Sequence, residues 1–278
     1  MSEEYRPIGV FDSGYGGLTI FSELLKKLPQ YDYIYLGDNA RNPYGTRSFD
    51  VVYEYTWQAV RYLFESGCQL VVLACNTASA KALRNIQQLD LPVHYPNRRV
   101  LGVIRPSVEM IPEMTKTGHV GVLGTTGTVL SESYPLEIAK MSPHSPIHVV
   151  QEACPMWVPI VENNLIESPG AACFVQQNIA GLFSRDPLID TVILGCTHYP
   201  LLFQVIMKYL PEGVVLLNQG PVVADRLQDY LMRHPEMESR CSKTGRRDYF
   251  TTESAGNFDH LANLFLGSDV RSKHIKLG

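Results

Sequence analysis

Two stretches of this chain share one pattern, and that pattern limits the possible folds more than any other feature of the sequence. Residues 71–77 read VVLACNT and residues 192–198 read VILGCTH, and a helix-compatible stretch follows each. An aliphatic run that ends in this way is typical of a buried parallel strand with a helix behind it. We therefore expect an α/β fold in which Cys75 and Cys196 lie at the carboxyl ends of strands, where open α/β sheets bind ligands.

Each of these two cysteines can be interpreted in two ways. Cysteine is among the most buried residue types, so either thiol alone is explained as a small core residue. Both, however, are followed at once by polar residues, at 76–77 and 197–198, which a core thiol does not need. Because two thiols are presented alike, one in each half of the chain, the pattern favours a paired acid and base.

The composition is that of an ordinary soluble globular protein. The chain has 278 residues, of which 45% are hydrophobic and 19% charged, and its formal net charge is -4 without a basic tract. This balance argues against nucleic acid as the main ligand. No apolar run approaches the length of a membrane span, and the polar start of the chain lacks a signal-peptide core. We expect a cytoplasmic protein that does not bind membranes.

The cysteines do not form a disulfide or metal-binding pattern. Six of them are scattered along the chain without a CxxC spacing. Cytosolic thiols stay reduced, so disulfide bonds are not expected. No Cys/His cluster has the spacing of zinc ligands, so we expect no metal site.

Apolar runs alternate with helix-compatible stretches along the whole chain. The predicted strands are 8–11, 33–38, 71–75, 120–124, 147–150, 192–196, 214–218 and 249–250. The predicted helices are 18–28, 48–66, 78–88, 131–141, 169–184, 201–205, 221–233 and 257–266. This alternation predicts an α/β protein with mostly parallel sheets, and the two cysteine units suggest two pseudo-symmetric α/β domains.

The segment 91–103, which contains Pro92 and Pro96, is interpreted as the first domain boundary. The first domain is expected to combine residues 1–97 with 214–278, and the second to span 98–213. The active site would then lie in the cleft between the two domains. Residues 235–246 are polar and charged and are expected to form a loop.

Polar loops follow several of the predicted strands. Residues 12–17 read DSGYGG, and their glycines allow close approach of the backbone to a ligand. Asp12 ends the first strand, and Ser13 is equally well explained as a helix N-cap or a ligand contact. The turn at 43–45 either fixes Tyr44 over a site or lets it pack at the surface. The threonine-rich turn at 125–128 begins a helix, which suits a carboxylate or phosphate.

These motifs together closely resemble those of the bacterial glutamate racemases, within the wider aspartate/glutamate racemase superfamily. The resemblance rests on Asp12-Ser13-Gly14, Pro43-Tyr44-Gly45, Cys75-Asn76-Thr77, Thr125-Thr126-Gly127-Thr128 with Ser131, Cys154-Pro155 leading to Val161-Glu162, and Cys196-Thr197-His198. It covers residues 8–230, and the order and rough spacing of all these motifs match. Within the superfamily, the Asp-Ser-Gly and Pro-Tyr-Gly signatures are those of the members that act on glutamate.

The resemblance implies a cofactor-independent enzyme that interconverts L- and D-glutamate and supplies D-glutamate for peptidoglycan. Racemisation needs an acid and a base on opposite faces of Cα. The resemblance implies that Cys75 takes the proton from D-glutamate and Cys196 from L-glutamate. It also implies that Asp12 assists Cys75, while Glu162 and His198 assist Cys196. His198 could instead contact a substrate carboxylate, and both roles stay open.

The anionic substrate would be held by polar side chains, backbone groups and helix dipoles. The candidate binding residues are Asp12, Ser13, Tyr44, Gly45, Asn76, Thr77, Thr125, Thr197 and His198. Pyridoxal phosphate is not expected, because Lys81 and Lys116 are the only lysines near core elements and Lys81 is assigned to the exposed face of a helix. The Cα proton must then be removed in a closed, dry, preorganised site.

The resemblance also implies a homodimer. Some members of the family respond to a peptidoglycan precursor and carry an N-terminal extension. Only a few residues precede the first predicted strand here, so this regulation is not expected.

Three other functions fit parts of the pattern. A related cofactor-free racemase could act on aspartate or a hydantoin, and an assay across these substrates would separate it. A small-molecule binding protein on a two-domain frame would need no pair of thiols. A hydrolase with a cysteine nucleophile and His198 as its base would need only one of the two thiols.

Overall fold

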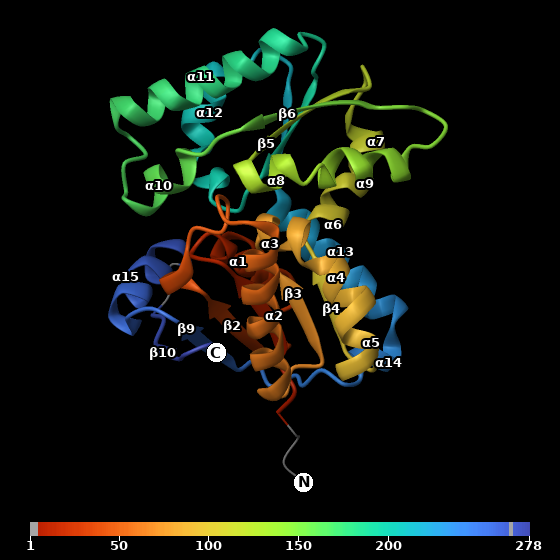
Figure 1. Cartoon of the computed structure of the whole chain (residues 1–278), viewed down its shortest axis with the longest axis vertical. Coiled ribbons are helices and arrows are strands. Elements are labelled where there is room, and N and C mark those ends of the chain that lie inside the picture. Colours follow the sequence, from red (N-terminus) through yellow and green to blue (C-terminus); the bar gives the residue numbers. More distant parts are fainter. Residues whose placement is uncertain (1–4, 267–268) are drawn as a thin grey trace.

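Two parallel β-sheets, each covered by helices, make up the chain in a computed structural model that describes residues 5–266 and 269–278 (Figure 1). The first sheet contains β1 (Ile8–Asp12), β2 (Tyr33–Gly37), β3 (Leu70–Leu73), β4 (Arg99–Gly102), β9 (Arg247–Thr251) and β10 (Ser272–His274). The second contains β5 (His119–Gly124), β6 (His148–Ala153), β7 (Thr191–Gly195) and β8 (Val215–Leu217). The predicted α/β class is confirmed.

The two sheets repeat one strand order. The first runs β10-β9-β2-β1-β3-β4, and the second runs β6-β5-β7-β8, so the order β2-β1-β3-β4 recurs in the second sheet. Cys75 follows β3 and Cys196 follows β7, which hold equivalent places in the two sheets. The predicted pseudo-symmetry of the two halves is therefore confirmed. The strand order reverses direction between β1 and β3 in the first sheet and between β5 and β7 in the second. These positions are the topological switch points, and such sheets bind ligands outside the carboxyl ends of the strands there.

Both faces of the first sheet are buried at its central strands β1, β2 and β3, which explains why these strands are largely apolar along their whole length. Ile8 and Val10 pack on the side of α1 (Gly17–Lys27), α13 (Gln219–Arg233) and α15 (Ala255–Leu266). Phe11 and Leu36 pack on the opposite side, with α2 (Phe49–Glu65) and α3 (Asn76–Lys81). Side chains of a strand alternate between the two faces, so each face receives its own apolar layer.

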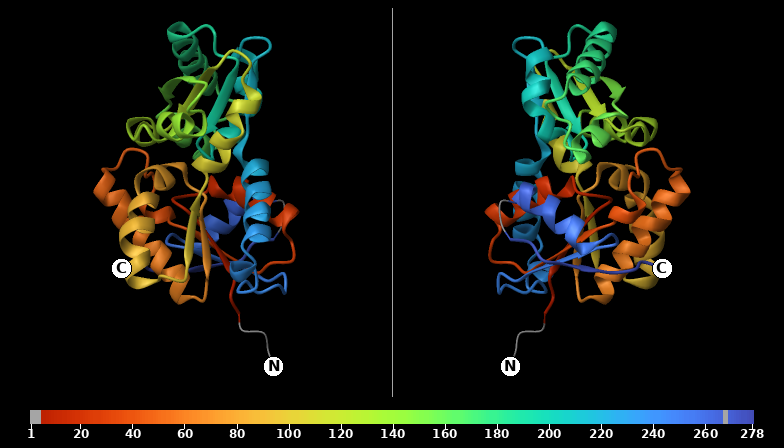
Figure 2. Two further views of the ribbon diagram at one scale, coloured as in Figure 1. Left: turned by 90° about the vertical axis from the view of Figure 1, so that its right-hand side faces the viewer. Right: turned by 90° about the vertical axis from the view of Figure 1, so that its left-hand side faces the viewer.

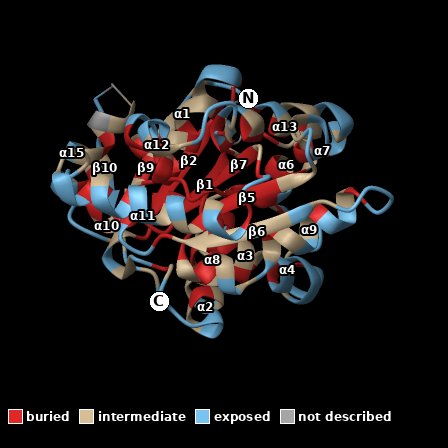
Figure 3. Ribbon diagram, turned by 90° about the horizontal axis from the view of Figure 1, so that it is seen from above, coloured by how far each residue is buried: buried red, intermediate tan, exposed pale blue. Residues whose placement is uncertain are grey.

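The second sheet is covered in the same way. Val192 and Leu194 face α10 (Trp157–Glu162), α11 (Pro169–Arg185) and α12 (Phe203–Tyr209). Ile193 faces α6 (Ile104–Glu109), α7 (Ile111–Met114) and α9 (Ser133–Met141). Figure 3 shows the central strands buried and the outward side of α11 exposed.

The remaining elements are short. They are α4 (Leu83–Asn85), α5 (Leu91–His94), α8 (Thr126–Leu130), α14 (Pro235–Glu238), the 3₁₀ turns Asn39–Arg41 and Tyr199–Leu202, and the π-helical turn Ile86–Asp90. Of the helices in the described ranges, none is both long and apolar enough to cross a bilayer.

The edge strands lie beyond the predicted domain boundaries. β4 pairs with β3, so the first sheet continues past residue 97, and β8 pairs with β7, so the second continues past residue 213. Boundaries at 97/98 and 213/214 would detach both strands from the sheets to which they are hydrogen-bonded. We propose that the chain passes between the two halves at Val103 and Asn218 instead. Figure 2 shows the two halves as separate lobes, one above the other.

Two segments contain more structure than the sequence predicted. The boundary segment 91–103 includes α5 and β4. The expected loop at 235–246 begins with α14 and then contacts Asp32, whose Oδ1 accepts hydrogen bonds from Thr244 N–H and Thr244 Oγ1 at 2.9 and 2.7 Å. The polar composition of this loop reflects the need to satisfy a buried carboxylate, since an unpaired buried charge is strongly unfavourable.

Candidate active site

Cys75 follows β3, two residues after its last residue Leu73, and caps helix α3. Its Sγ accepts a hydrogen bond from Ala78 N–H at 3.4 Å and lies 3.3 Å from Ser13 Oγ. Ser13 comes from the loop after β1, the neighbouring strand. The thiol is therefore positioned by the first turn of α3 and by the adjacent loop, and only 5% of Cys75 is exposed.

The surroundings of Cys75 favour its thiol form. Burial raises the pKa of Cys75, the nearby Asp12 carboxyl raises it further, and hydrogen bonds from Ser13 and Ala78 N–H oppose them, with the pKa at about 12. Asp12 accepts a hydrogen bond from Gly14 N–H at 3.0 Å. Burial raises the pKa of Asp12 as well, against the attraction of His198. As a fixed charge, Asp12 therefore opposes the thiolate, and its expected help must come from accepting a proton.

Cys196 has a different neighbour, the imidazole of His198. Cys196 Sγ lies 3.8 Å from His198 Nδ1, and His198 Nε2 lies 2.9 Å from Glu162 Oε1. Burial opposes the charged imidazolium, but hydrogen bonds to Cys196 and Glu162 outweigh it and raise the pKa of His198 to about 10. A protonated His198 next to Cys196 stabilises a thiolate there.

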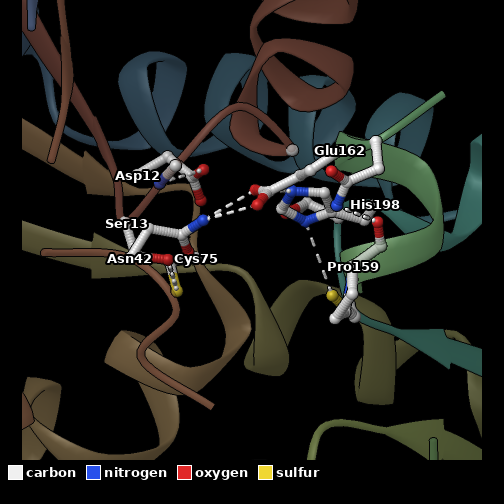
Figure 4. A network of polar contacts seen from close by, with 12 residues as sticks. Asp12, Ser13, Asn42, Cys75, Pro159, Glu162 and His198 are labelled. Atoms are coloured by element: carbon white, nitrogen blue, oxygen red, sulfur yellow. Dashed lines mark hydrogen bonds and ion pairs between the residues drawn. The ribbon is translucent and has the colours of Figure 1, made fainter. Parts of the chain in front are cut away.

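The Cys196 partners are held from the opposite half of the chain. Asn42, in the loop after β2, donates to Glu162 Oε1 and Oε2 at 2.8 and 2.7 Å (Figure 4). Gly16, in the loop after β1, passes so close to His198 that a Cβ there would lie 2.3 Å from Nδ1. Gly16 is one of the glycines predicted to allow close approach to a ligand, and the group that it allows to approach here is the His198 ring from the other half.

Both thiols line one small cavity of about 120 Å³. Pockets for drug-sized ligands measure roughly 300–1,000 Å³, so this cavity fits a smaller molecule. The residues of its wall are Ser13, Asn42, Pro43, Tyr44, Gly45, Thr46, Cys75, Asn76, Thr77, Thr125, Thr126, Cys154, Pro155, Val158, Pro159, Cys196, Thr197 and His198. Two predicted site residues, Asp12 and Glu162, are not part of the wall: Glu162 is hydrogen-bonded to the wall residue His198, and Asp12 acts on Cys75 through its charge.

Several wall residues join the two halves. Thr77 Oγ1 lies 3.0 Å from Thr125 Oγ1. The Asn76 amide is occupied on both ends, because its Nδ2 donates to Gln219 Oε1 and its Oδ1 accepts from Tyr134 Oη, both at 2.7 Å. A ligand would therefore meet the backbone of Asn76, whereas the hydroxyls of the threonines remain at the wall.

Tyr44 and Gly45 form part of the wall in a way that the sequence left open. The Tyr44 hydroxyl donates to Asp38, and Tyr44 is 1% exposed, so the ring packs while its polar end points away from the ligand space. Gly45 accepts a hydrogen bond from Gly127 N–H at 2.7 Å through its carbonyl. Tyr44 thus lies at the cavity, as the first interpretation has it, and it packs in the interior and not at the surface, as the second has it.

Lys81 is not on an exposed helix face, as the sequence suggested. It is 9% exposed, and its Nζ donates to the Arg47 carbonyl at 2.6 Å. Burial lowers the pKa of this lysine. Lys81 fixes the segment after the Pro-Tyr-Gly turn and lies outside the cavity wall; in the described part of the chain the wall contains no lysine that could form a Schiff base with a cofactor.

The sequence reasoning missed Asn42, Thr126 and the apolar wall formed by Cys154, Val158 and Pro159. Asn42 immediately precedes the Pro-Tyr-Gly motif, and Cys154 lies in a motif used for the resemblance. Their nearness to these motifs in the sequence could have identified them as site residues. Val158 and Pro159 gave none, because an apolar residue of a pocket wall looks like a core residue in the sequence.

Comparisons with known proteins identify the family of this chain. The model of the Asp/Glu/Hydantoin racemase family matches residues 19–227. A glutamate racemase from Geobacter metallireducens is 39% identical over 267 residues, which covers 96% of this chain and 94% of that protein. The chain belongs to the glutamate racemase family. It is therefore an enzyme of the amino-acid racemase class, an isomerase.

Solved structures of glutamate racemases share the whole fold of this family member. An isoform from Bacillus anthracis superposes with a TM-score of 0.88 at 34% identity, covering 99% of each chain. A glutamate racemase from Francisella tularensis, solved in complex with D-glutamate, gives a TM-score of 0.85 at 30% identity, covering 98% of each chain. Membership of this family leaves the binding-protein and hydrolase interpretations without support, since each would leave a thiol of the cavity unused.

Proposed function

We propose that this chain racemises glutamate without a cofactor, by a mechanism in which two cysteines act as bases on opposite faces of Cα. The observation that carries this proposal is that Cys75 and Cys196, from equivalent strands of opposite halves, line one small cavity. Racemisation of a carbon needs an acid and a base on opposite sides of it. Family membership supports glutamate as the substrate.

In the direction from L- to D-glutamate, Cys196 removes the Cα proton as a thiolate. The imidazolium of His198 stabilises this thiolate, and Glu162 keeps His198 protonated. Cys75, whose raised pKa keeps it a thiol, delivers a proton to the other face. The roles exchange in the reverse direction, for which Asp12 is the candidate acceptor of the Cys75 proton.

The remaining wall holds the substrate and excludes water. The proposed contacts are Asp12, Ser13, Tyr44, Gly45, Asn76, Thr77, Thr125, Thr197 and His198, of which all but Asp12 line the cavity. Fixed hydroxyl and backbone dipoles in a small, closed cavity stabilise developing charge at Cα better than water does. Among the described residues, His198 is the only wall side chain that can carry a positive charge, so recognition of the carboxylates depends largely on hydroxyl and N–H donors.

We further propose that the D-glutamate supplies peptidoglycan synthesis in the cytoplasm and that the enzyme works as a homodimer. The family membership supports both proposals. Complementation of a D-glutamate auxotroph tests the first, and analytical ultracentrifugation tests the homodimer.

The direct test is incubation of the dialysed protein with L-glutamate in deuterated water. From L-glutamate we expect D-glutamate that carries deuterium at Cα. From D-glutamate we expect L-glutamate that carries deuterium at Cα. Aspartate and hydantoins are assayed in parallel. Faster exchange with one of them would show that this compound, and not glutamate, is the substrate. Loss of activity on dialysis that pyridoxal phosphate restores would contradict the proposal.

A further inference from the structure

Three side chains meet at the edge of the second sheet that lies opposite the cavity. His119 begins β5, His148 begins β6, and Asp186 follows α11. The strand register pairs His119 with His148, and their ring centroids are 5.2 Å apart. Cys196 follows the carboxyl end of β7 in the same parallel sheet, whereas the histidines stand at the amino ends of their strands.

The three side chains point their ligand atoms at one another. His119 Nδ1 and His148 Nδ1 lie 2.7 and 2.8 Å from the same oxygen, Asp186 Oδ2, and the three atoms all lie within 4.8 Å of one another. Asp186 is buried, and its other oxygen accepts a hydrogen bond from Leu188 N–H at 3.0 Å. The carboxylate is therefore fixed in orientation, while His148, whose side chain is 59% exposed, opens the group to water.

No cationic side chain competes with the histidines for Asp186 in the described part of the chain. Arg185, the preceding residue, directs its guanidinium to Glu152. The ion pairs of Asp186 are those with His119 and His148. The three side chains are a buried carboxylate and two imidazoles, and imidazole binds metal ions in its neutral form. No lysine or arginine of the described residues occupies the place that a metal ion would take.

We propose that His119, His148 and Asp186 bind a divalent transition-metal ion of the Zn²⁺ class. Two imidazole nitrogens and one carboxylate oxygen, with water in the open position, are a ligand set that Zn²⁺ accepts and that Mg²⁺ does not favour. Tetrahedral ligands at about 2.0–2.2 Å from Zn²⁺ stand about 3.3–3.5 Å apart. Both rings must therefore withdraw from Asp186 by roughly 0.6 Å, and both side chains are partly exposed, that of His119 by 28% and that of His148 by 59%.

Binding also requires a change of protonation that balances. In a neutral ring the Nδ1 hydrogen moves to Nε2, and an imidazolium instead releases a proton to solvent, so that Nδ1 is free to bind the ion. The bound ion would join the starts of two strands to the end of α11. The sequence predicted no metal site because the ligands come from three separate elements, and His119 and Asp186 stand 67 residues apart.

The test is a calorimetric titration of the chelator-treated full chain with ZnCl2. The titration uses a Cys75→Ser, Cys196→Ser background, because this pair of cavity thiols could also bind Zn²⁺. We expect one site per chain from the cluster, and affinity reduced at least tenfold by His148→Asn and by Asp186→Asn. Asparagine keeps an N–H donor near the place of Nδ1, so His148→Asn preserves the hydrogen bond and removes the metal ligand. His260→Asn, at an exposed histidine of α15, is the matched control and should bind as the background does.

Thermal unfolding gives a second readout. Zn²⁺ at about a hundred times its dissociation constant should raise the Tm of the background protein by on the order of 5 °C, and MgCl2 should not. Without added metal, His148→Asn should melt near the background, which shows that it folds. Equal Zn²⁺ affinity in the His148→Asn, Asp186→Asn and His260→Asn proteins would overturn the proposal, and so would a background protein that binds no Zn²⁺ at millimolar concentration. Either result would mean that the three side chains only form hydrogen bonds with one another. Neither result would affect the proposed racemase function.

Discussion

Single side chains make the two thiols unlike each other, although the strands that carry them are equivalent. Cys75 meets Ser13 and the buried Asp12, whose charge favours the thiol. Cys196 meets His198, whose charge favours the thiolate. This difference suits the proposed mechanism, in which Cys196 takes a proton from L-glutamate and Cys75 gives one.

The pH dependence of this arrangement depends on His198. Hydrogen bonds to Cys196 and Glu162 raise its pKa to about 10, above its ordinary value of about 6.5. The folded-state pKa exceeds the unfolded one, so the stability from the charged ring is fully present below about pH 6.5 and is lost as the pH rises through about 10. We expect kcat/KM for L-glutamate and the free energy of unfolding to fall together as the pH approaches 10.

Glu162→Gln tests the cause of this shift. The neutral amide can still hydrogen-bond to His198 but no longer attracts its charge, so the alkaline limb of the pH–rate profile should move to lower pH. Because proton transfer by a positioned group contributes typically 10²–10⁴-fold, kcat/KM for L-glutamate should fall about 10²-fold at pH 8. Asn163→Ala, at the exposed next residue, is the control. An alkaline limb that stays in place in the Glu162→Gln enzyme would remove Glu162 from this role.

Gly16 has a steric role that substitution can measure. A Cβ at this position would lie 2.3 Å from His198 Nδ1 and 2.6 Å from Thr197 Oγ1. Gly16→Ala should displace His198 from Cys196 and lower kcat about 10²-fold, since shifts of about 1 Å have effects of that size. Gly170→Ala, where the Cβ would meet Ser168 Oγ at an ordinary 3.7 Å, should keep full activity. Equal activity of the two variants would contradict the close-approach argument.

At the scale of elements, the sequence predicted the central strands and their polar ends well. Period and composition identify strands whose two faces are both buried, and the carboxyl ends of parallel strands meet by geometry. They did not identify β4 or β10, because edge strands such as Arg99–Gly102 are short and partly polar. They also could not place Asn42, Gln219 or Lys81, whose positions depend on contacts between distant segments.

Gln219 begins α13, at the proposed passage between the two halves, and connects four elements. It accepts from Asn76 Nδ2 at 2.7 Å and donates to Ser107 Oγ and Tyr134 Oη at 2.7 and 2.8 Å. Gln219→Met should lower the free energy of unfolding by about 2–4 kcal/mol, because it leaves buried polar partners unsatisfied. It should also reduce kcat, because Asn76 adjoins Cys75.

Urea unfolding and steady-state kinetics check this prediction. Gln228→Met, at a half-buried position of the same helix, should change the unfolding free energy by less than about 0.5 kcal/mol and leave kcat unchanged. If Gln219→Met matched Gln228→Met in both measurements, the network at the start of α13 would be no more than incidental to the site.

At the scale of the whole molecule, the site exists only where the two halves meet. Each half provides one thiol, and contacts such as Asn42 with Glu162 and Thr19 Oγ1 with the Thr197 carbonyl, at 3.0 Å, cross between them. This arrangement predicts that the thiols act on opposite faces of the substrate. It also predicts that racemisation needs both, so Cys75→Ser and Cys196→Ser should each lower it by 10²-fold or more.

The most direct test uses a glutamate analogue with a leaving group at Cβ. When a base removes the Cα proton, the leaving group departs with its electron pair, and the enamine that forms hydrolyses to 2-oxoglutarate and ammonia without any reprotonation on the opposite face. Release of 2-oxoglutarate is measured for both enantiomers of the analogue with both variants. We predict that Cys75→Ser still eliminates from the L-analogue, where Cys196 is the base, and that Cys196→Ser still eliminates from the D-analogue, where Cys75 is the base. Equal loss with both analogues in both variants would contradict the assignment of one thiol to each face.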